Sequence, residues 1–347
     1  MITLDEIAKL ANVSRGTIDR VIHNRGRVSE ETQHRVKGII EKFDYKPNIL
    51  ARGLSRTKTC NIAVIIPQLA QDGKYWELPT KGIDKAQEEL KVYKVKITFF
   101  LYDKFSETSF ERACQSFLSS EVKFDAMLLA PVLYRATEKF IQKIPNTLPY
   151  VFFDSYIPCS KCLSYVGEDS FQSGLLAAKL MNLLIKGKTG TVAVFQVIPE
   201  DYHIMDRVKG FHAFFENGPN LLLKNYKVDR EGDELVFFKK TGDILRESQE
   251  TIGIFVPNAC TYQVANYLKL YPPKEKISLV GYDLVEESKP HINSGLIDFA
   301  ISQRSELQGY ESIYSLFKHV VLHSKIPEKI IVPLDIVTKE NVGYYYD

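Results

Sequence analysis

Two patterns of hydrophobic positions divide the chain near residue 58. Up to that point apolar residues recur every three or four positions, the spacing of one face of an α-helix. Ser14 and Ser29 stand where helices begin, and Thr3 with Glu6 forms a capping box, because these side chains accept bonds from first-turn N–H groups. The pattern predicts three short helices whose inward faces are Leu4, Ile7, Ala8 and Ala11; Ile18, Val21 and Ile22; and Val36, Ile39, Ile40 and Phe43. Two short helices joined by a three-residue turn are typical of a helix-turn-helix unit, which binds DNA.

From residue 61 the pattern changes to short apolar strands that alternate with amphipathic helices. Such alternation predicts parallel sheets covered by helices on both faces, and about 290 residues are enough for two lobes. The strands are expected at 62–66, 95–102, 126–129, 150–153, 192–195, 253–256, 277–280 and 299–301. Helices are expected between the strands, and they include 78–90, 109–118, 170–184, 208–215, 262–270 and 305–321.

Charge separates the same two parts. Twelve basic and seven acidic residues up to Lys58 give a net charge of +5, whereas the whole chain carries +2, so the remainder carries −3. A basic head on an acidic body suits a module that binds a polyanion. No apolar run approaches the ~20 residues of a membrane span, and the N-terminus lacks the pattern of a signal peptide. Together with five scattered cysteines, these features favour a location in the reducing bacterial cytoplasm, and a DNA-binding head would place the protein at the nucleoid.

The head resembles the DNA-binding domain and hinge of the lactose/galactose-repressor family. The resemblance lies in TLDEIAKLANVSRGTIDRVIHN, then VSEETQHRV, then DYKPNILARGL. It implies a head at 1–46 and a hinge at 47–58 that becomes helical on operator DNA, where Ala51 and Leu54 contact the minor groove and Leu54 is a wedge between base steps. A plain linker with an incidental leucine is the alternative, and Gly53 weakens the hinge helix.

The resemblance also gives roles to residues of the head. Arg15, Gly16 and Thr17 begin the helix that reads bases, Arg20 is a second base reader, and Arg15 suits a guanine. Gly16 has no side chain to read with, and Asp19 is expected to face a cytosine amine or to pair with Arg15 or Arg20. The residues expected to hold phosphates are Thr3, Ser14, Asn24, Arg27 and Asn48.

Polar and aromatic residues follow the ends of the predicted strands in the body. Ligands bind beyond the carboxyl ends of parallel strands; aromatic rings stack on sugar C–H faces, and polar side chains bond hydroxyls. The candidates for binding an effector are Tyr75, Trp76, Asp154, Arg207, Asn258, Asp283 and Gln303. Purely structural alternatives are core aromatics for Tyr75 and Trp76, and helix caps for Asn258 and Asp283. Asp169 is expected to cap the helix that begins at Ser170.

These residues resemble the sugar-binding set of the periplasmic-binding-protein type I fold, the effector domain of the same family. The matching motifs are YWELPTKGIDKA, VFFDS, VGEDSFQSG, RVKGF, FVPNA, LVGYD and ISQ. Gly73 and Ser155 depart from the asparagine and arginine that pentose binders often have, so the sugar's identity does not carry over. The resemblance implies one effector-binding and dimerisation domain, 59–347. Its first lobe comprises about 59–168 plus 302–333, and its second about 169–301 plus 334–347.

Motifs of catalysis and metal binding are missing from the sequence: there is no G-x-S-x-G, no H-E-x-x-H and no phosphate-binding glycine loop. Cys159 and Cys162 form a lone C-x-x-C in a polar loop, and His203 and Asp206 are expected at the rim of the cleft. We therefore expect no catalytic residue, metal or cofactor.

The sequence predicts a homodimeric transcriptional regulator, a repressor that binds a pseudo-palindromic operator under the control of a sugar-like effector. The alternatives are a sugar-modifying α/β enzyme with an accessory DNA-binding head, and a regulator that uses a purine or sugar-phosphate corepressor.

Overall fold

The head is the predicted three-helix unit. In the computed structural model of the chain, the described residues are 4–22, 26, 28–43, 58–158, 161–198, 201–216, 221–229 and 235–345. The chain divides into two compact units between Thr57 and Lys58, and each is described by itself. The first unit contains α1 (Leu4–Leu10), α2 (Arg15–Ile22) and α3 (Glu30–Lys42).

The apolar stripes of the head converge as predicted where their side chains are described, which excludes those of Leu4 and Ile22, and Phe43 is the exception. The core consists of the buried side chains Ile7, Ala8, Ala11, Ile18, Val21 and Val36. Ser14 caps α2 by accepting a bond from the Thr17 N–H at 3.2 Å, and Ser29 accepts one from the Thr32 N–H at 3.4 Å. The inward orientation predicted for Phe43 is wrong: its side chain is 46% exposed, because it follows the last residue of α3.

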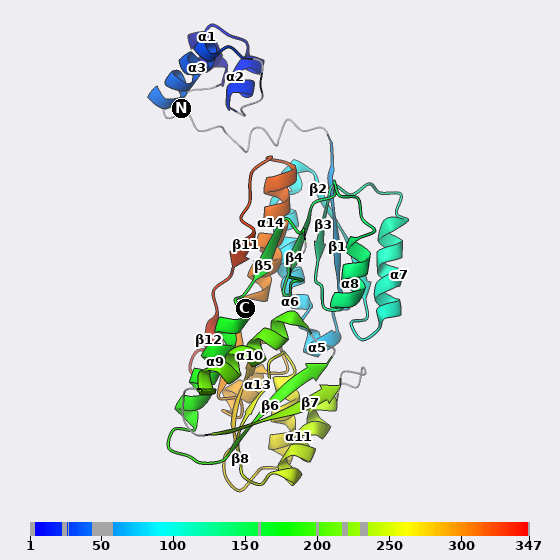
Figure 1. The fold of residues 1–347 in the computed structure, drawn as a ribbon, viewed down its shortest axis with the longest axis vertical. Helices are drawn as coiled ribbons and strands as arrows, with labels where there is room; N and C mark the ends of the chain where they lie inside the picture. The colour runs from blue at the N-terminus through cyan, green and yellow to red at the C-terminus, as the bar shows by residue number, and fades with distance from the viewer. Residues whose placement is uncertain are drawn as a thin grey trace. The chain divides into compact units, whose positions relative to one another are not determined.

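The second unit contains two six-stranded sheets, each wrapped in helices, and we call each sheet with its helices a lobe (Figure 1). The first sheet has the order β11-β5-β4-β3-β1-β2 and is parallel throughout. Its strands are β1 (Cys60–Pro67), β2 (Val95–Tyr102), β3 (Ala126–Leu129), β4 (Tyr150–Phe153), β5 (Ser164–Gly167) and β11 (Lys329–Ile331). Its helices are α5 (Gln71–Lys74), α6 (Glu77–Glu89), η1 (Lys91–Tyr93), α7 (Glu107–Leu118), α8 (Tyr134–Ile141) and α14 (Ser305–Val320).

Both faces of the first sheet are buried, which explains why its central strands are continuously apolar. Along β1, Ile62 and Val64 pack on α6 and α14, whereas Ala63 and Ile65 pack on α7 and α8 (Figure 1). The helices α6 and α14 cross very closely, since a Cβ added at Gly82 would lie 1.8 Å from the Glu306 carbonyl oxygen.

The second sheet repeats the first with one reversed edge strand. Its order is β12-β10-β9-β8-β6-β7, and β12 runs antiparallel to β10, so the prediction of purely parallel sheets is wrong at this edge. Its strands are β6 (Thr191–Ile198), β7 (Leu222–Asp229), β8 (Thr251–Phe255), β9 (Ser278–Tyr282), β10 (Phe299–Ser302) and β12 (Asp335–Val337). Its helices are α9 (Ser170–Leu184), α10 (Tyr202–Glu216), α11 (Val236–Glu247), α12 (Thr261–Leu270), α13 (Lys289–Asn293) and η2 (Val342–Tyr345).

The chain passes between the sheets three times: from β5 into α9, from β10 into α14, and from β11 into β12. These crossings tie the two lobes together while leaving the ends of their strands facing a shared site.

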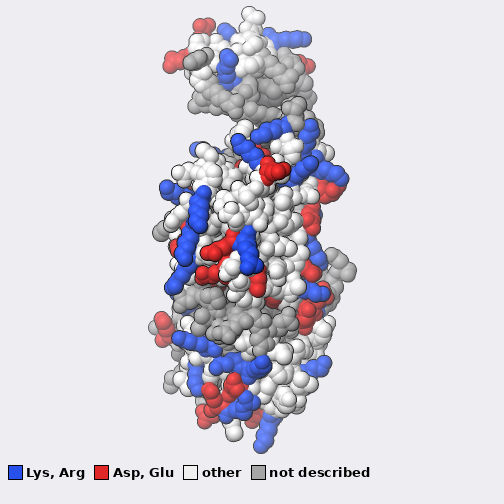
Figure 2. Space-filling model, turned by 90° about the vertical axis from the view of Figure 1, so that its right-hand side faces the viewer, with Lys and Arg blue, Asp and Glu red and all other residues white. Residues whose placement is uncertain are grey.

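The surface of the second unit carries charges of both signs. On the face shown in Figure 2, Lys and Arg side chains lie among Asp and Glu side chains over both lobes. Among the residues that the structure describes, no helix combines the length and the apolar character needed to cross a bilayer.

Candidate functional site

The outer face of α2 holds the described part of the predicted DNA-reading surface. Ile18 and Val21 are buried on one side of this helix, while Gly16 and Arg20, four residues apart on the other side, are exposed. Ser14 and Thr17 are joined through their hydroxyls at 3.0 Å at the start of the helix. Arg15 and Asp19 belong to α2, but their side chains are not described; Thr3, Asn24, Arg27, Asn48, Ala51 and Leu54 lie outside the described residues.

The seven residues predicted to bind an effector all line one cavity at the carboxyl ends of both sheets. They come from separate elements that follow β1, β4, β6, β8, β9 and β10, and the cavity has a volume of about 20 Å³. It is also lined by Asp72, Lys104, Val132, Asp201, His203, Ile204 and Ala259, which the sequence analysis did not name as effector-binding residues.

Asp154 and Asp283 occupy equivalent places in the two lobes. Each directly follows the third strand of its sheet, β4 or β9, with a left-handed backbone (φ 66° and 67°) that Asp tolerates better than most residues. Each donates its N–H to the next strand, Asp154 to the Val166 carbonyl at 3.2 Å and Asp283 to the Ile301 carbonyl at 2.9 Å. The repeated strand-to-loop geometry therefore aims two carboxylates at one cavity.

Tyr75 connects the two aspartates. Its hydroxyl donates to Asp154 Oδ1 and accepts from Gln303 Nε2 at 3.0 Å, and Gln303 Nε2 also donates to Asp283 Oδ1 at 3.1 Å. Ser305 adds a further bond to the Tyr75 hydroxyl at 3.1 Å.

Three cations of the cavity each have a carboxylate of their own. Lys104 Nζ contacts Asp72, Arg207 Nε donates to Glu168 Oε1 at 2.6 Å, and His203 Nδ1 lies 2.8 Å from Asp201 Oδ1. The Arg207 guanidinium also lies over the Tyr282 ring, 4.0 Å from its centroid, and Nη1 donates to the Pro257 carbonyl at 2.8 Å.

Burial shifts the ionisation of these groups. It raises the pKa of Asp283 from 3.8 to about 7, with Arg207 and Gln303 opposing the shift, and it raises the pKa of Asp154. Burial lowers the pKa of His203, but the Asp201 carboxylate outweighs it and the net pKa is raised, which favours an imidazolium paired with Asp201. Burial likewise disfavours the charged Arg207, yet Glu168 raises its pKa, so the guanidinium stays charged.

Several buried polar atoms in the cavity wall have no hydrogen-bond partner among the described residues. They are Trp76 Nε1, Arg207 Nη2 and Asn258 Nδ2, and all three are donors. A buried donor without an acceptor costs about 1–3 kcal/mol, so such atoms mark places where a ligand can contribute acceptors.

The structural alternatives for the candidates have mixed outcomes. Tyr75 and Trp76 do belong to the core of the first lobe, and both also line the cavity. Asn258 makes a turn, since its Oδ1 accepts from the Cys260 N–H at 3.2 Å, but α12 has no side-chain cap. Asp283 caps no helix, because α13 starts after Ser288. Asp169 is the cap of α9, as predicted.

Two predictions beside the cavity need correction. His203 is buried in the cavity wall and not at its rim, and Arg207 lies in the second turn of α10, which begins at Tyr202 and not at Val208. Asp206 accepts a bond from the Tyr156 hydroxyl at 2.7 Å. Cys159 lies outside the described residues, and among the described ones no group of three or more His, Cys, Asp or Glu is placed to hold a metal ion.

The lobes touch directly at the cavity. Ser155 Oγ donates to Asp201 Oδ1 at 2.6 Å, and the Tyr156 ring lies 6.0 Å from that of Tyr202. These contacts, with the Tyr156–Asp206 bond, join the loop after β4 to Asp201 and the first turns of α10. A cavity of about 20 Å³ between them holds about one water molecule, so the described conformation is closed.

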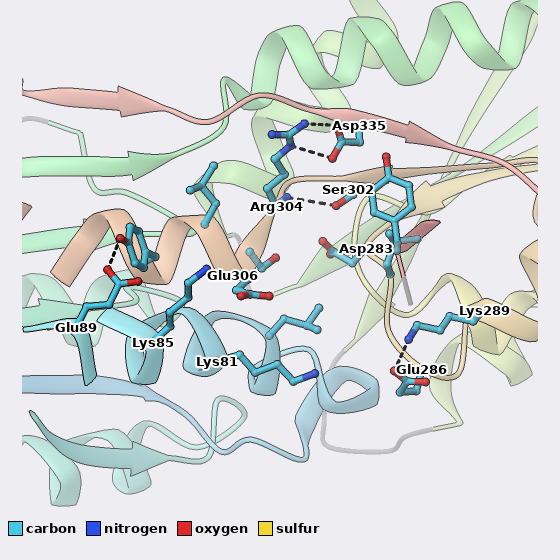
Figure 3. Close-up of a pocket in the computed structure, with 16 residues that line it drawn as sticks. Lys81, Lys85, Glu89, Asp283, Glu286, Lys289, Ser302, Arg304, Glu306 and Asp335 are labelled. Carbon is cyan, nitrogen blue, oxygen red and sulfur yellow. Dashed lines mark hydrogen bonds and ion pairs between the residues drawn. The ribbon is translucent and has the colours of Figure 1, made fainter. Parts of the chain in front are cut away.

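A larger groove of about 870 Å³ lies beside the cavity and shares only Asp283 with it (Figure 3). Its walls are α6, the start of α14 and the segment after β9, and most of its charged groups are exposed. Arg304 holds Asp335 through two bonds of 2.9 and 2.7 Å, and Glu89 accepts from the Tyr310 hydroxyl at 2.7 Å. None of the other six predicted effector residues reaches this groove.

Comparisons with known proteins agree with the two units. Residues 62–322 match the family described as periplasmic binding protein domain, and residues 3–48 match that described as bacterial regulatory proteins, lacI family. Catabolite control protein A of Streptococcus mutans is 40% identical over 83 residues, which span 24% of each chain.

Two other matches span most of the chain. The sucrose operon repressor of the same organism is 25% identical and covers 98% of this chain and 99% of its own. A crystal structure from Bacteroides fragilis, assigned as a LacI transcriptional regulator, has a TM-score of 0.77 and 26% identity, over 83% of this chain and 100% of its own. The chain therefore belongs to the lacI family of bacterial regulatory proteins, with a periplasmic-binding-protein domain following its DNA-binding head.

Proposed function

We propose that the protein is a transcriptional repressor that binds a pseudo-palindromic operator as a homodimer in the bacterial cytoplasm, and that a sugar-like effector controls its affinity for DNA. The observation that carries the proposal is the convergence of seven predicted residues from both lobes on one buried cavity. A relative over the full length is named for a sucrose operon, which supports a sugar as the effector.

The effector acts on the equilibrium between open and closed lobes. A sugar ring does not fit in about 20 Å³, so the contacts of Ser155 with Asp201 and of Tyr156 with Asp206 must part before it enters. Closure on the ligand then turns one lobe against the other. Because β1 follows the linker directly, this rotation within a dimer moves the points at which the two hinges leave the body. The ligand shifts DNA affinity only by its differential affinity for the two states.

The proposal is tested by a thermal-shift screen on the full chain with monosaccharides, disaccharides, sugar acids and nucleobases. A ligand at 100 times its Kd stabilises the folded state by about 2.7 kcal/mol, and Asp283→Ala should lose that shift. A screen in which no sugar-like compound raises the Tm sinks the sugar effector. Product analysis after prolonged incubation distinguishes the enzyme alternative, which requires turnover of a compound that binds.

DNA recognition is tested with operators selected from a randomised duplex pool. We expect Arg15→Ala to relax the base preference at one operator position at a cost of about 1–3 kcal/mol. Equal weakening on every sequence would instead make Arg15 a phosphate contact. We expect Leu54→Ala to reduce both DNA bending and affinity, and unchanged binding would make residues 47–58 a plain linker.

A further inference from the structure

The charges that line the cavity do not balance. Four aspartates face it, and its three basic side chains already have carboxylate partners: Asp72 for Lys104, Asp201 for His203, and Glu168 for Arg207. Asp154 and Asp283 remain, and neither forms an ion pair within the part of the chain that the structure describes.

These two carboxylates have neutral partners. Asp154 accepts from the Tyr75 hydroxyl and Asp283 from the Gln303 amide, and the chain Asp154–Tyr75–Gln303–Asp283 links them through three hydrogen bonds. Their side chains are 2% and 3% exposed, so water does not replace the missing cation. Burial of an ionised carboxylate without a countercharge is unfavourable, which is consistent with the raised pKa of both groups.

The other groups of the cavity wall that lack a partner are hydrogen-bond donors. Trp76 Nε1, Arg207 Nη2 and Asn258 Nδ2 are buried and have no hydrogen-bond partner among the described residues. The cavity thus offers two carboxyl groups that have no ion-pair partner among the described residues, and three donors that need acceptors. A neutral sugar satisfies the donors but forms no ion pair with Asp154 or Asp283, whereas a phosphate or sugar acid brings a further acidic group beside them.

We propose that the effector is an amino sugar, a polyhydroxylated ring whose protonated amine binds Asp154 and Asp283 and whose oxygens accept from Trp76, Arg207 and Asn258. This inference rests on the proposed function and specifies the ligand class for the same cavity. A primary ammonium carries three N–H donors, which is enough to bond both carboxylates at once.

Titration calorimetry on the full chain tests the inference with matched triplets: D-glucose, D-glucosamine and N-acetyl-D-glucosamine, and the corresponding galactose and mannose series. We expect one amine-bearing sugar to bind at least tenfold more tightly than its hydroxyl parent and its N-acetyl form, because acetylation removes the positive charge while keeping the ring.

Two isosteric variants test whether Asp283 and Asp154 cause the preference for the amine-bearing sugar. Asp283→Asn and Asp154→Asn should each reduce the preference for the amine at least tenfold, and binding of the hydroxyl parent should weaken much less. Asp169→Asn is the matched control, since asparagine also caps a helix and Asp169 does not line the cavity; it should keep the full preference. Thermal melting of each variant establishes that it is folded.

The outcomes separate this inference from the function on which it rests. A hydroxyl parent in the calorimetry panel, or a sugar acid in the thermal-shift screen, that binds as tightly as any amine overturns the amino sugar and leaves the sugar effector in place. A preference for the amine that survives in both Asn variants overturns the assigned residues and with them the inference. Binding of no member of the panel overturns the amino sugar, and failure of the wider screen above overturns the sugar effector as well.

Discussion

The cavity and the groove beside it differ in opposite directions in their size and in the burial of their charged groups. The groove is more than forty times larger in volume, about 870 against about 20 Å³, yet its charged groups are mostly solvated. Arg304 is 43% exposed in its pair with Asp335, whereas Arg207 is 1% exposed in its pair with Glu168. Burying charges is costly, so a small space lined by buried ions indicates function more strongly than a large one lined by exposed ions.

The largest expected effect is a difference in folding stability between variants of the Arg207–Glu168 pair and of the Arg304–Asp335 pair. Arg207→Met leaves the Glu168 carboxylate buried and unpaired, which we expect to destabilise the fold by about 3–5 kcal/mol. Arg304→Met is the matched control in the groove and should cost ~0–1 kcal/mol, because its partner is reached by water. Chemical denaturation of both variants measures the difference. Equal losses would show that the two pairs are equally solvated and would remove the contrast.

A second prediction concerns Asp283, the residue that both spaces share. Its pKa rises from 3.8 to about 7 on folding, so the folded chain holds this proton to higher pH than the unfolded chain. Folding favours the protonated form of Asp283. The contribution of this protonated group to folding stability is therefore lost as pH rises from about 4 to about 7. At ~1.4 kcal/mol per pKa unit, the loss is on the order of 4 kcal/mol.

Asp283→Asn removes that titration. Relative to wild type, we expect the variant to gain stability as pH rises from 5 to 8, measured by thermal melting in the absence of ligand. Arg207, Asp154, Glu168 and Gln303 face Asp283 and are present in both proteins, so they largely cancel in the comparison. The matched control Asp335→Asn, in the groove, should show no such divergence. Parallel curves for wild type and Asp283→Asn would mean that the Asp283 carboxylate is already ionised and solvated.

Several residues that line the cavity were predictable from the sequence because of a general property of parallel sheets. Asp154, Asp283 and Gln303 follow apolar strands directly, and the carboxyl ends of such strands converge. The strands missed by the sequence analysis are β5 and β11, which are short, the reversed edge strand β12, and the other edge strand β7, whose Leu222 is largely exposed.

The partners of the cavity's ions were not predictable. Lys104 and Asp72 are 32 residues apart, and Glu168 and Arg207 are 39 apart, so only the packed structure brings them together. Asp72 also adopts a left-handed backbone, with φ 56°, next to Gly73 with φ 64°, and no hydrophobic periodicity reports such a turn. These pairings decide which carboxyl groups have no ion-pair partner, so the charge of the proposed ligand could not be predicted from the sequence.

The smallest expected effect concerns the contacts that hold the cavity shut. Ser155→Ala removes the bond from Ser155 Oγ to Asp201 Oδ1, while Asp201 keeps its contact with His203. A net loss of about 1 kcal/mol from the ligand-free closed state, which is too small to hold a sugar, should strengthen effector affinity about fivefold, with a corresponding change in operator affinity. Tyr310→Phe is the control in the groove, where it loses an exposed bond to Glu89 and should leave both affinities unchanged. Calorimetry with the effector and fluorescence anisotropy with operator DNA measure the two quantities. If Ser155→Ala leaves effector affinity intact and Tyr310→Phe changes it, the groove and not the cavity is coupled to the ligand.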